Sequence, residues 1–422
     1  MNENSKICRE LKYVEQQLGE PASFNKEAVI EDFKALYPEI GIKMNENGLA
    51  IFNYGIGANF TDPVIQEARG IIIDMVSLNV VCWPFRKFGK YDEPYADDID
   101  WLSAVVQEKI DGSIIKFWFD EIKQKWVFST NSTIYAEDAM ANEDKGITFM
   151  DIIQKTPEYQ RLSEETNGFK DSLRVYYTKI RSICNIPSKD LTFIFELTSP
   201  DNRVVVPYEE YHLRHIGTRD NKTGQEYDTK LMDIEKPKTY PLTSLEDCIN
   251  AALALNINEN SGKLGNLDNE GFVVVDKNYH RIKIKSPEYM MLHSIVSNSI
   301  QSKRYLIEML YRDRIDLDIV GRNYPDLSHI IYYYKYKLEE VLYEAKAMID
   351  ITRKLSKKFT ERKDIAIRIK DQRTSMLGFI YLNNTERTAD DIIEEFYQKG
   401  KLLKLIPDYV GPDFSDCFRE QE

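Results

Sequence analysis

Residues 105–119 read V-V-Q-E-K-I-D-G-S-I-I-K-F-W-F and place one lysine, Lys109, at a turn between two strand-like runs. Asp-Gly is a frequent turn signal in β-hairpins, so an ordinary turn is one interpretation of this stretch. The other interpretation is nucleophilic. A lysine held near other cations or away from water loses its proton more easily, and its neutral amine can attack an electrophile. Attack on the α-phosphate of a nucleotide would give a lysyl-nucleotide intermediate.

Three further stretches carry charges that suit a nucleotide. F-I-F-E-L ends a strand-like run with Glu196, and N-E-G-F-V-V-V begins another with Glu270. R-I-K-I-K at 281–285 alternates, which places Lys283 and Lys285 on one strand face and two isoleucines on the other. Two lysines on one face suit a triphosphate or its leaving pyrophosphate, and two carboxylates in the same pocket suit Mg²⁺.

The composition is that of a globular protein of more than one domain. The chain has 422 residues, 42% of them hydrophobic, and a net charge of −13, which excludes a protein that coats nucleic acid by bulk charge alone. Its five cysteines form no C-x-x-C pair, so we expect reduced thiols and a cytoplasmic location. No apolar run reaches the roughly 20 residues of a membrane span.

The hydrophobic pattern changes along the chain. We expect helices over 10–40 and 135–185. We expect strands over 49–54, 70–75, 80–83, 114–119, 126–129, 191–197, 204–206, 271–276 and 281–285. Helical spacing then covers 289–310, 327–359, 365–377 and 389–400, with Thr388 as the N-cap and Gly400 as the C-cap of the last helix. These patterns predict an α+β N-terminal domain and an all-helical C-terminal domain, with the boundary near residue 295.

The order of these motifs resembles the covalent nucleotidyltransferase superfamily of DNA ligases, RNA ligases and mRNA-capping enzymes. K-I-D-G-S resembles motif I, F-E-L motif III, E-G-F-V-V motif IV and K-I-K-S motif V. Three other strings are most similar to the RNA ligase 1 family of T-even phages: E-A-R-G-I at 67–71, W-P-F-R-K-F at 83–88 and P-D-N-R-V-V at 200–205. The resemblance covers roughly residues 50–295.

This resemblance implies an adenylyltransferase domain over 1–295, with antiparallel β-sheets and flanking helices, and a helical domain over 296–422. It implies that Lys109 is the site of adenylylation and that Asp111 and Gly112 shape the motif I turn. It implies that Lys283 and Lys285 bind the α-phosphate and assist the departure of pyrophosphate.

The resemblance also implies roles for residues outside these two motifs. Arg69 would contact the nucleotide or the incoming 5′-phosphate, and Lys87 a further phosphate. Glu196 would contact the ribose or metal-bound waters, and Glu270 a divalent metal, so both are predicted metal-site residues. Two tyrosines complete the predicted nucleotide site: Tyr54 and Tyr289.

Three positions depart from the family pattern. The family carries a basic residue in the segment after motif I, where we align Asn131, so one phosphate contact is expected to be missing. Trp83 stands where the family usually has arginine, and Phe88-Gly89 replaces a pair of aromatic residues.

The predicted function is an ATP-dependent RNA ligase that uses Mg²⁺, or Mn²⁺, to join 5′-phosphate and 3′-hydroxyl RNA ends through lysyl-AMP and RNA-adenylate intermediates. Capping enzymes and DNA ligases typically carry an OB-fold after motif V, whereas the 137 residues after Lys285 have helical spacing (422 − 285). This difference argues against both classes, and a capping-type guanylyltransferase is kept only as an alternative. A non-catalytic RNA-end or tRNA-binding protein is another.

RNA repair is the predicted setting, with nicked tRNA as a candidate substrate and a separate end-healing kinase–phosphatase as a candidate partner. Arg353–Lys370 has eight basic and two acidic residues, a net charge of +6 (8 − 2), and residues 324–343 include six tyrosines. These residues favour RNA recognition by the helical domain. A helix with a solvated basic face and buried tyrosines explains the same pattern.

Overall fold

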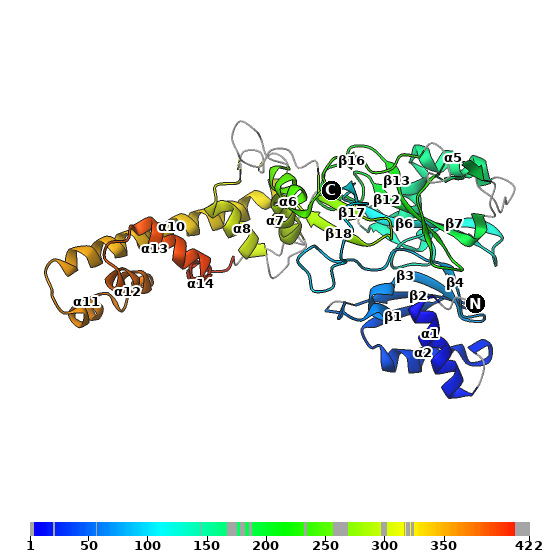
Figure 1. The fold of residues 1–422 in the computed structure, drawn as a ribbon, viewed down its shortest axis with the longest axis horizontal. Helices are drawn as coiled ribbons and strands as arrows, with labels where there is room; N and C mark the ends of the chain where they lie inside the picture. Colours follow the sequence, from blue (N-terminus) through cyan, green and yellow to red (C-terminus); the bar gives the residue numbers. More distant parts are fainter. Residues whose placement is uncertain are drawn as a thin grey trace. The chain divides into compact units, whose positions relative to one another are not determined.

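The computed structural model describes residues 4–19, 22–55, 57–143, 145–166, 175–177, 182–184, 188–231, 234–255, 269–296, 302–315, 317, 321 and 325–409. The chain divides into two compact units. The first unit comprises Met1–Leu255 and Asp268–Ser286, and the second comprises Asn256–Leu267 and Pro287–Glu422. Sheets with flanking helices build the first unit, whereas the described elements of the second unit are helices (Figure 1).

An N-terminal sheet of the first unit is antiparallel and has the strand order β1-β2-β3-β4. Its strands are β1 (Ile40–Met44), β2 (Leu49–Tyr54), β3 (Arg69–Asp74) and β4 (Asn79–Cys82). Helices α1 (Lys6–Leu18) and α2 (Ala22–Leu36) cover one face of this sheet (Figure 1). Leu11, Phe33 and Phe52 belong to the core between them. The short helix α3 (Pro63–Glu67) leads into β3, so Arg69 begins a strand.

A second sheet has the order β14-β13-β12-β6-β7. Its strands are β6 (Ser113–Asp120), β7 (Lys125–Ser129), β12 (Leu191–Thr198), β13 (His212–Asp220) and β14 (Glu226–Tyr227). Phe117, Phe193 and Phe195 pack on one face, together with residues of α4 (Phe149–Gln154) and α5 (Pro157–Thr166). Shorter elements surround this sheet: η1 (Ala136–Asp138), β8 (Met140–Asn142), β9 (Ile147–Thr148), β10 (Val175–Tyr177), β11 (Ser182–Cys184), η2 (Ser188–Asp190) and β15 (Thr229–Leu231).

A third sheet has the order β16-β5-β17-β18. Its strands are β5 (Val105–Lys109), β16 (Thr239–Tyr240), β17 (Gly271–Val275) and β18 (Arg281–Lys285), and its helix is α6 (Leu245–Ala254). Phe272, Ile282 and Ile284 point into the core on the side of α6. Because β5 belongs to this sheet and β6 to the second sheet, the turn at 110–112 connects the two.

The second unit is built around one long helix. Its described helices are α7 (Pro287–Val296), α8 (Ser302–Tyr311), α10 (Pro325–Ser356), α11 (Arg362–Ile369), α12 (Ser375–Asn383), α13 (Ala389–Gln398) and α14 (Lys401–Leu405). The buried positions of α10 recur at intervals of three and four residues, for example at Tyr334, Leu338 and Val341. α8, α11, α12 and α13 all pack against α10. Among the described residues, no helix is both long and apolar enough to span a bilayer.

The structure confirms the α+β region followed by helices, and the expected strands β2, β3, β4, β6, β7, β12, β17 and β18 are present within one or two residues. Two predictions for the first unit were wrong. Residues 204–206 are not a strand, because the amides of Val205 and Val206 donate to the Asp111 carboxylate. The described part of 135–185 contains the short strands β8, β9, β10 and β11 as well as helices.

The second unit also tests the predicted helix boundaries and caps. The helix expected over 365–377 is two helices, separated at 370–374. Thr388 is the N-cap of α13, as predicted. The C-cap of α13 is Lys399, one residue before the predicted Gly400, which adopts the left-handed conformation with φ of 65°.

Candidate active site

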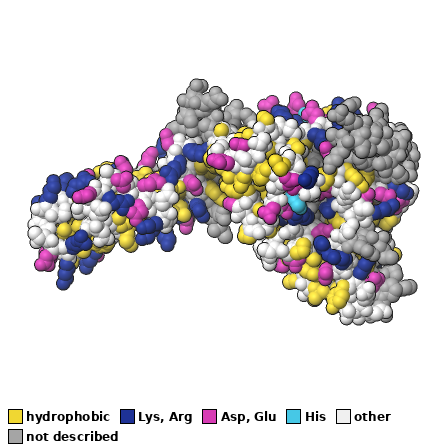
Figure 2. All heavy atoms as spheres, viewed as in Figure 1, with side chains coloured by type: hydrophobic (Ala, Val, Ile, Leu, Met, Phe, Trp, Pro, Cys, Tyr) yellow, Lys and Arg dark blue, Asp and Glu magenta, His cyan; other side chains and the backbone are white. Residues whose placement is uncertain are grey.

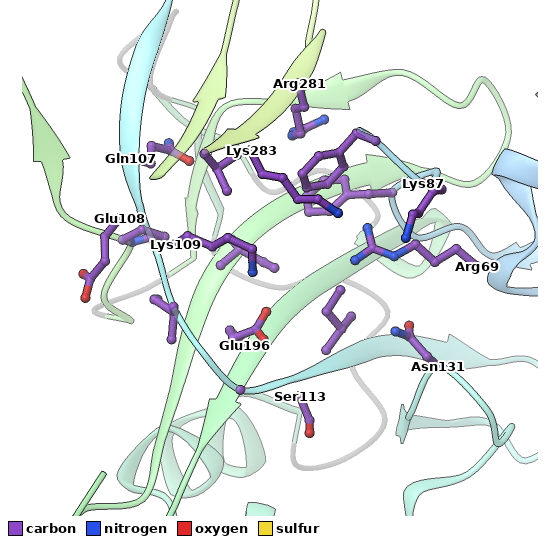
Figure 3. Close-up of a pocket in the computed structure, with 18 of the residues that line it drawn as sticks. Arg69, Lys87, Gln107, Glu108, Lys109, Ser113, Asn131, Glu196, Arg281 and Lys283 are labelled. Carbon is purple, nitrogen blue, oxygen red and sulfur yellow. The ribbon is translucent and has the colours of Figure 1, made fainter. Parts of the chain in front are cut away.

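The motif residues of the first unit surround one cavity of about 420 Å³. This volume lies within the range of small-molecule sites. Six basic side chains and two carboxylates line the cavity: Arg69, Lys87, Lys109, Arg281, Lys283, Lys285, Glu108 and Glu196. They come from β3, β5, β12, β18 and the segment after β4 (Figure 3). The excess of cations predicts an anionic ligand with several negative charges.

Strand register brings Lys109, Glu270 and Lys285 together. Gly271 pairs with Lys109 on β5 and with Lys285 on β18, so both lysines lie beside Glu270, the residue before Gly271. Lys109 Nζ donates to Glu270 Oε2 at 2.6 Å, and Lys285 Nζ lies 2.8 Å from Glu270 Oε1. The side chain of Glu270 is only 3% exposed. One buried carboxylate therefore holds the predicted nucleophile and one motif V lysine.

These pairs set the charge states of the site. Burial disfavours the charged form of Lys109, but the nearby carboxylates of Glu270 and Glu196 outweigh burial and raise the pKa of the Lys109 amine. Burial likewise disfavours the Glu270 carboxylate, and Lys109 and Lys285 outweigh it and lower the pKa of Glu270. Both groups are therefore charged at neutral pH in the unliganded protein.

For Glu196, burial outweighs the neighbouring positive charge, so its pKa is raised and not lowered. Its side chain points into the same space as Lys109 (Figure 3) and forms no ion pair among the described residues. Burial raises the pKa of Glu196 to about 7, Lys109 opposes the shift, and the charge of Glu270 adds to it. The two carboxylates therefore differ in protonation near neutral pH.

The opposite wall of the cavity carries cations without carboxylate partners. Burial and the neighbouring charge of Lys87 lower the pKa of Lys283 to about 7. The Lys87 ammonium lies over the rings of Tyr54 and Phe60, at 5.3 and 4.8 Å from their centroids. Lys87, Lys283 and Arg69 form no ion pair within the part of the chain that the structure describes, and their nitrogens converge in Figure 3.

Residues that follow β12 hold the motif I turn through backbone hydrogen bonds. The Asp111 carboxylate accepts hydrogen bonds from the amides of Val205 and Val206, both at 2.8 Å. A Cβ on Gly112 would lie 2.3 Å from the carbonyl oxygen of Leu197, which leaves room only for glycine. Both residues therefore constrain the turn that presents Lys109; Gly112 also lines the cavity, whereas Asp111 lies outside its lining.

The other predicted residues have different positions. Tyr54 lies behind Lys87 and outside the cavity lining. Asn131 lines the cavity, and its Oδ1 is buried with no hydrogen-bond partner among the described residues. Tyr289 is a buried residue of α7 in the second unit, so its predicted role stays untested.

Two basic residues near the cavity escaped the sequence prediction. Arg281 begins the alternating strand and shares the face of Lys283, so the period of two was a usable signal. Its guanidinium pairs with Glu226 at 2.5 Å and lies over Phe85. Lys116 is a lone lysine in the apolar strand β6 and is completely buried.

Within the described residues, no cluster of three or more His, Cys, Asp or Glu side chains has a metal-binding arrangement.

Comparison with protein families identifies this class of site. The sequence model of the RNA ligase family matches residues 67–289, just over half of the chain and the span of all the motif strings from E-A-R-G-I to K-I-K-S. The chain therefore belongs to the RNA ligase family, and the resemblance inferred from the motifs is confirmed.

Individual relatives share different parts of the chain. A putative bifunctional polynucleotide kinase/RNA ligase of Autographa californica nuclear polyhedrosis virus is 31% identical over 263 residues, which cover 59% of this chain and 34% of that protein. The chain thus matches about a third of that relative's length. An RNA ligase of Rhodothermus phage RM378 is 24% identical, covering 84% of this chain and 91% of that protein. A solved structure of an archaeal ATP-dependent RNA ligase is 12% identical, covering 74% of this chain and 79% of that chain, with a TM-score of 0.40.

Proposed function

We propose that the chain is an ATP-dependent RNA ligase that joins 5′-phosphate and 3′-hydroxyl RNA ends through lysyl-AMP and RNA-adenylate intermediates. One observation carries the proposal. The Lys109 amine opens into a cavity lined by five further basic side chains, and Glu270 bridges it to Lys285. Family membership supports RNA as the substrate.

In the first step the Lys109 nitrogen attacks the α-phosphorus of ATP. The Lys109 ammonium must first lose a proton, because the neutral amine is the nucleophile and the pKa of Lys109 is raised in the free protein. A P–N bond then forms as the P–O bond to pyrophosphate breaks, and the nitrogen releases a second proton to pyrophosphate or water. Glu270 accepts a hydrogen bond from Lys109 and orients the amine. The rate of adduct formation should therefore rise with pH above neutrality.

The cations opposite Lys109 suit the triphosphate. Lys283 has a pKa of about 7 because it is buried among other cations, so bound phosphates would supply its missing counter-charge and raise that pKa. Lys285, Lys87 and Arg69 add charge around the same space. We propose that Lys283 and Lys285 neutralise the α-phosphate and the leaving pyrophosphate. ATP binding near pH 7 should then be accompanied by proton uptake.

We propose that Glu196 and Glu270 hold Mg²⁺, or Mn²⁺, with nucleotide oxygens and water. Mg²⁺ in nucleotide enzymes is commonly bound by one or two carboxylates and substrate phosphates. The fit is supported by the charge of Glu270, which contributes to the raised pKa of Glu196; a divalent cation would relieve that repulsion. When bound, such a cation adds charge neutralisation at the reacting phosphate.

In the later steps the same cavity serves two further displacements at phosphorus. An RNA 5′-phosphate oxygen attacks the lysyl-AMP phosphorus, the P–N bond breaks, and the RNA-adenylate forms. The 3′-hydroxyl oxygen of the second end then attacks the 5′-phosphate, loses its proton, and AMP leaves. Arg69 and Lys87, which have no carboxylate partners among the described residues, suit the incoming 5′-phosphate.

We propose that the second unit contributes RNA recognition. Lys and Arg side chains gather over the meeting point of α10 and α11 (Figure 2). Six of them are exposed and form no ion pair among the described residues: Lys354, Lys357, Lys358, Arg362, Lys363 and Lys370. Nicked tRNA is the proposed substrate class, with its ends prepared by a separate kinase–phosphatase. The buried free thiols of Cys8, Cys82 and Cys248 are consistent with a reducing, cytoplasmic setting.

The test is covalent labelling of the purified chain with α-³²P-labelled nucleotides and Mg²⁺, followed by a denaturing gel. We expect an adduct with ATP, none with GTP, and none in EDTA. Lys109→Ala should abolish the adduct, whereas Lys125→Ala, an exposed lysine of β7, should not change it. The intact mass of untreated protein reveals any AMP already bound.

Joining is tested separately with 5′-phosphorylated RNA, DNA and nicked tRNA. RNA joining that is lost in Lys109→Ala supports the proposal. An adduct with GTP alone would point to a capping-type guanylyltransferase. An unmodified chain that binds RNA ends but forms no adduct would point to a non-catalytic RNA-binding protein.

A further inference from the structure

Lys116 is a buried cation outside the motifs of the family. It lies within β6 between Ile115 and Phe117, and its side chain has no solvent exposure. It forms no ion pair with a carboxylate anywhere in the described ranges. Its ammonium donates a short hydrogen bond to the carbonyl oxygen of Gly70. A buried ammonium without a counter-ion is costly, so its retention points to a function beyond packing.

The Lys116 ammonium lies where three segments meet. Gly70, the second residue of β3, has φ of +82°, a conformation that favours glycine. A Cβ built on Gly70 would lie 2.9 Å from Lys116 Nζ and 2.7 Å from the carbonyl oxygen of Asn131. The start of β3, the middle of β6 and the loop after β7 are therefore in direct contact, with no room for another side chain.

Two of these neighbours belong to the cavity wall. Arg69, whose peptide bond leads into Gly70, and Asn131 both line the cavity. The Arg69 guanidinium lies 5.4 Å from the ring of Phe88, hydrogen-bonds the carbonyl oxygen of Arg86 at 3.5 Å and interacts with the Tyr54 side chain. No carboxylate among the described residues forms an ion pair with Arg69. Its direction therefore depends on the backbone at 69–70 as well as on these contacts.

We infer that Lys116 is a positioning residue, which holds the Arg69–Gly70 backbone against the Asn131 loop from behind the cavity and so directs the Arg69 guanidinium at a phosphate. The inference rests on the proposed function of the cavity. Burial lowers the pKa of Lys116 to about 8, so the ammonium is still charged at neutral pH.

The test is a double-mutant cycle of Lys116→Met and Arg69→Ala. Inorganic tripolyphosphate binding, measured by calorimetry, and adenylylation with ATP are the two readouts. If Lys116 acts through Arg69, Lys116→Met alone should weaken tripolyphosphate binding about tenfold. It should raise the KM for ATP more than it lowers kcat. In the Arg69→Ala background it should have no further effect on either readout.

Two controls separate positioning from folding. Lys125→Met removes an exposed lysine of the neighbouring strand and should leave both readouts unchanged. Thermal unfolding of each variant shows any loss of stability, which should be the same with and without Arg69. If Lys116→Met fails to fold, Lys116→Gln keeps a donor without the charge and takes its place in the cycle.

Losses that add in the double variant, or unchanged tripolyphosphate binding in Lys116→Met, would overturn the inference. The unaltered chain could fail to form the adduct while Lys116→Met still weakens tripolyphosphate binding only when Arg69 is present. That result would support the role of Lys116 and reject the proposed function. If the unaltered chain is adenylylated normally but the losses add in the double variant, the proposed function is supported and the role of Lys116 is rejected.

Discussion

The two units of this chain use charge in different ways. Beside the cavity of the first unit, charged side chains are buried and share partners: Glu270, 3% exposed, is bridged by Lys109 and Lys285. In the second unit the exposed lysines Lys357, Lys358 and Lys363 have no acidic partner in the described residues. Buried pairs fix side chains and shift pKa values, whereas exposed charges act through long-range, salt-sensitive attraction. The difference predicts chemistry in the first unit and nucleic-acid attraction in the second.

The largest expected effect comes from removing the shared carboxylate. Glu270→Ala leaves Lys109 and Lys285 without their common partner and removes one proposed metal ligand. We expect the rate of adduct formation with ATP to fall by about 10²–10³-fold, measured in a single turnover. Glu344→Ala is the matched variant in the second unit, because it breaks the half-exposed pair with Arg373. Its rate should match the unaltered chain, and a similar fall in both variants would refute the contrast.

Glu196 provides a stability test of the same contrast. Its pKa is about 7 in the folded chain and near 4.5 when unfolded. Its contribution to stability is therefore complete below pH 4.5 and is lost as the pH rises through 7, where the buried carboxyl ionises. Glu196→Gln avoids that ionisation. We expect the variant to be more stable than the unaltered chain by roughly 1–3 kcal/mol at pH 8, and equal to it near pH 4.5.

Chemical denaturation of the first unit at the two pH values measures this difference. The control is Glu108→Gln, because the Glu108 carboxylate points away from Lys109 and Glu196 (Figure 3). A constant difference across the pH range, or the same trend in Glu108→Gln, would show that burial of Glu196 is not the cause.

A smaller effect is expected from the exposed lysines. Joint replacement of Lys357, Lys358 and Lys363 by alanine should reduce RNA joining at low RNA concentration about tenfold. It should also reduce the magnitude of the slope of log K for RNA binding against log salt concentration by about 2. Adduct formation with ATP should not change.

A matched triple variant replaces lysines that already have acidic partners in the second unit: Lys335, Lys346 and Lys399. It should change RNA joining much less, because their charges are partly neutralised. Equal losses in the two triple variants would mean that pairing does not distinguish these lysines.

The same contrast explains what could be read from the sequence. The alternation of R-I-K-I-K was sufficient to place Lys283 and Lys285 on the cavity face, with Ile282 and Ile284 in the core. Local periodicity carries that information because a strand alternates whatever its neighbours are. The motif resemblance supplied Glu196, which lines the cavity, and Glu270, which pairs with the lining residues Lys109 and Lys285. No local pattern brings these two carboxylates together.

The remaining features depend on contacts between distant segments. Val205 and Val206 have strand-forming side chains, yet their amides donate to Asp111, about 95 positions earlier. Lys116 stands in an otherwise apolar strand, and nothing in the local sequence predicts its contact with the carbonyl oxygen of Gly70. Tertiary hydrogen bonds of this kind override propensity and leave no periodic signal.

The smallest expected effect concerns two helix starts, one in each unit. Thr148 caps α4 and Thr388 caps α13, and each forms a reciprocal capping box with the aspartate three residues later. Thr388→Ala should lower hydrogen-exchange protection of the α13 amides about fivefold and leave α4 and adduct formation unchanged. Thr148→Ala should do the converse for α4. Because neither threonine contributes to the cavity lining, these variants perturb each unit by a local backbone change alone. Loss of protection in both helices from either single variant would mean that the units do not open independently, and the separation of chemistry from RNA attraction would then need a shared structural basis.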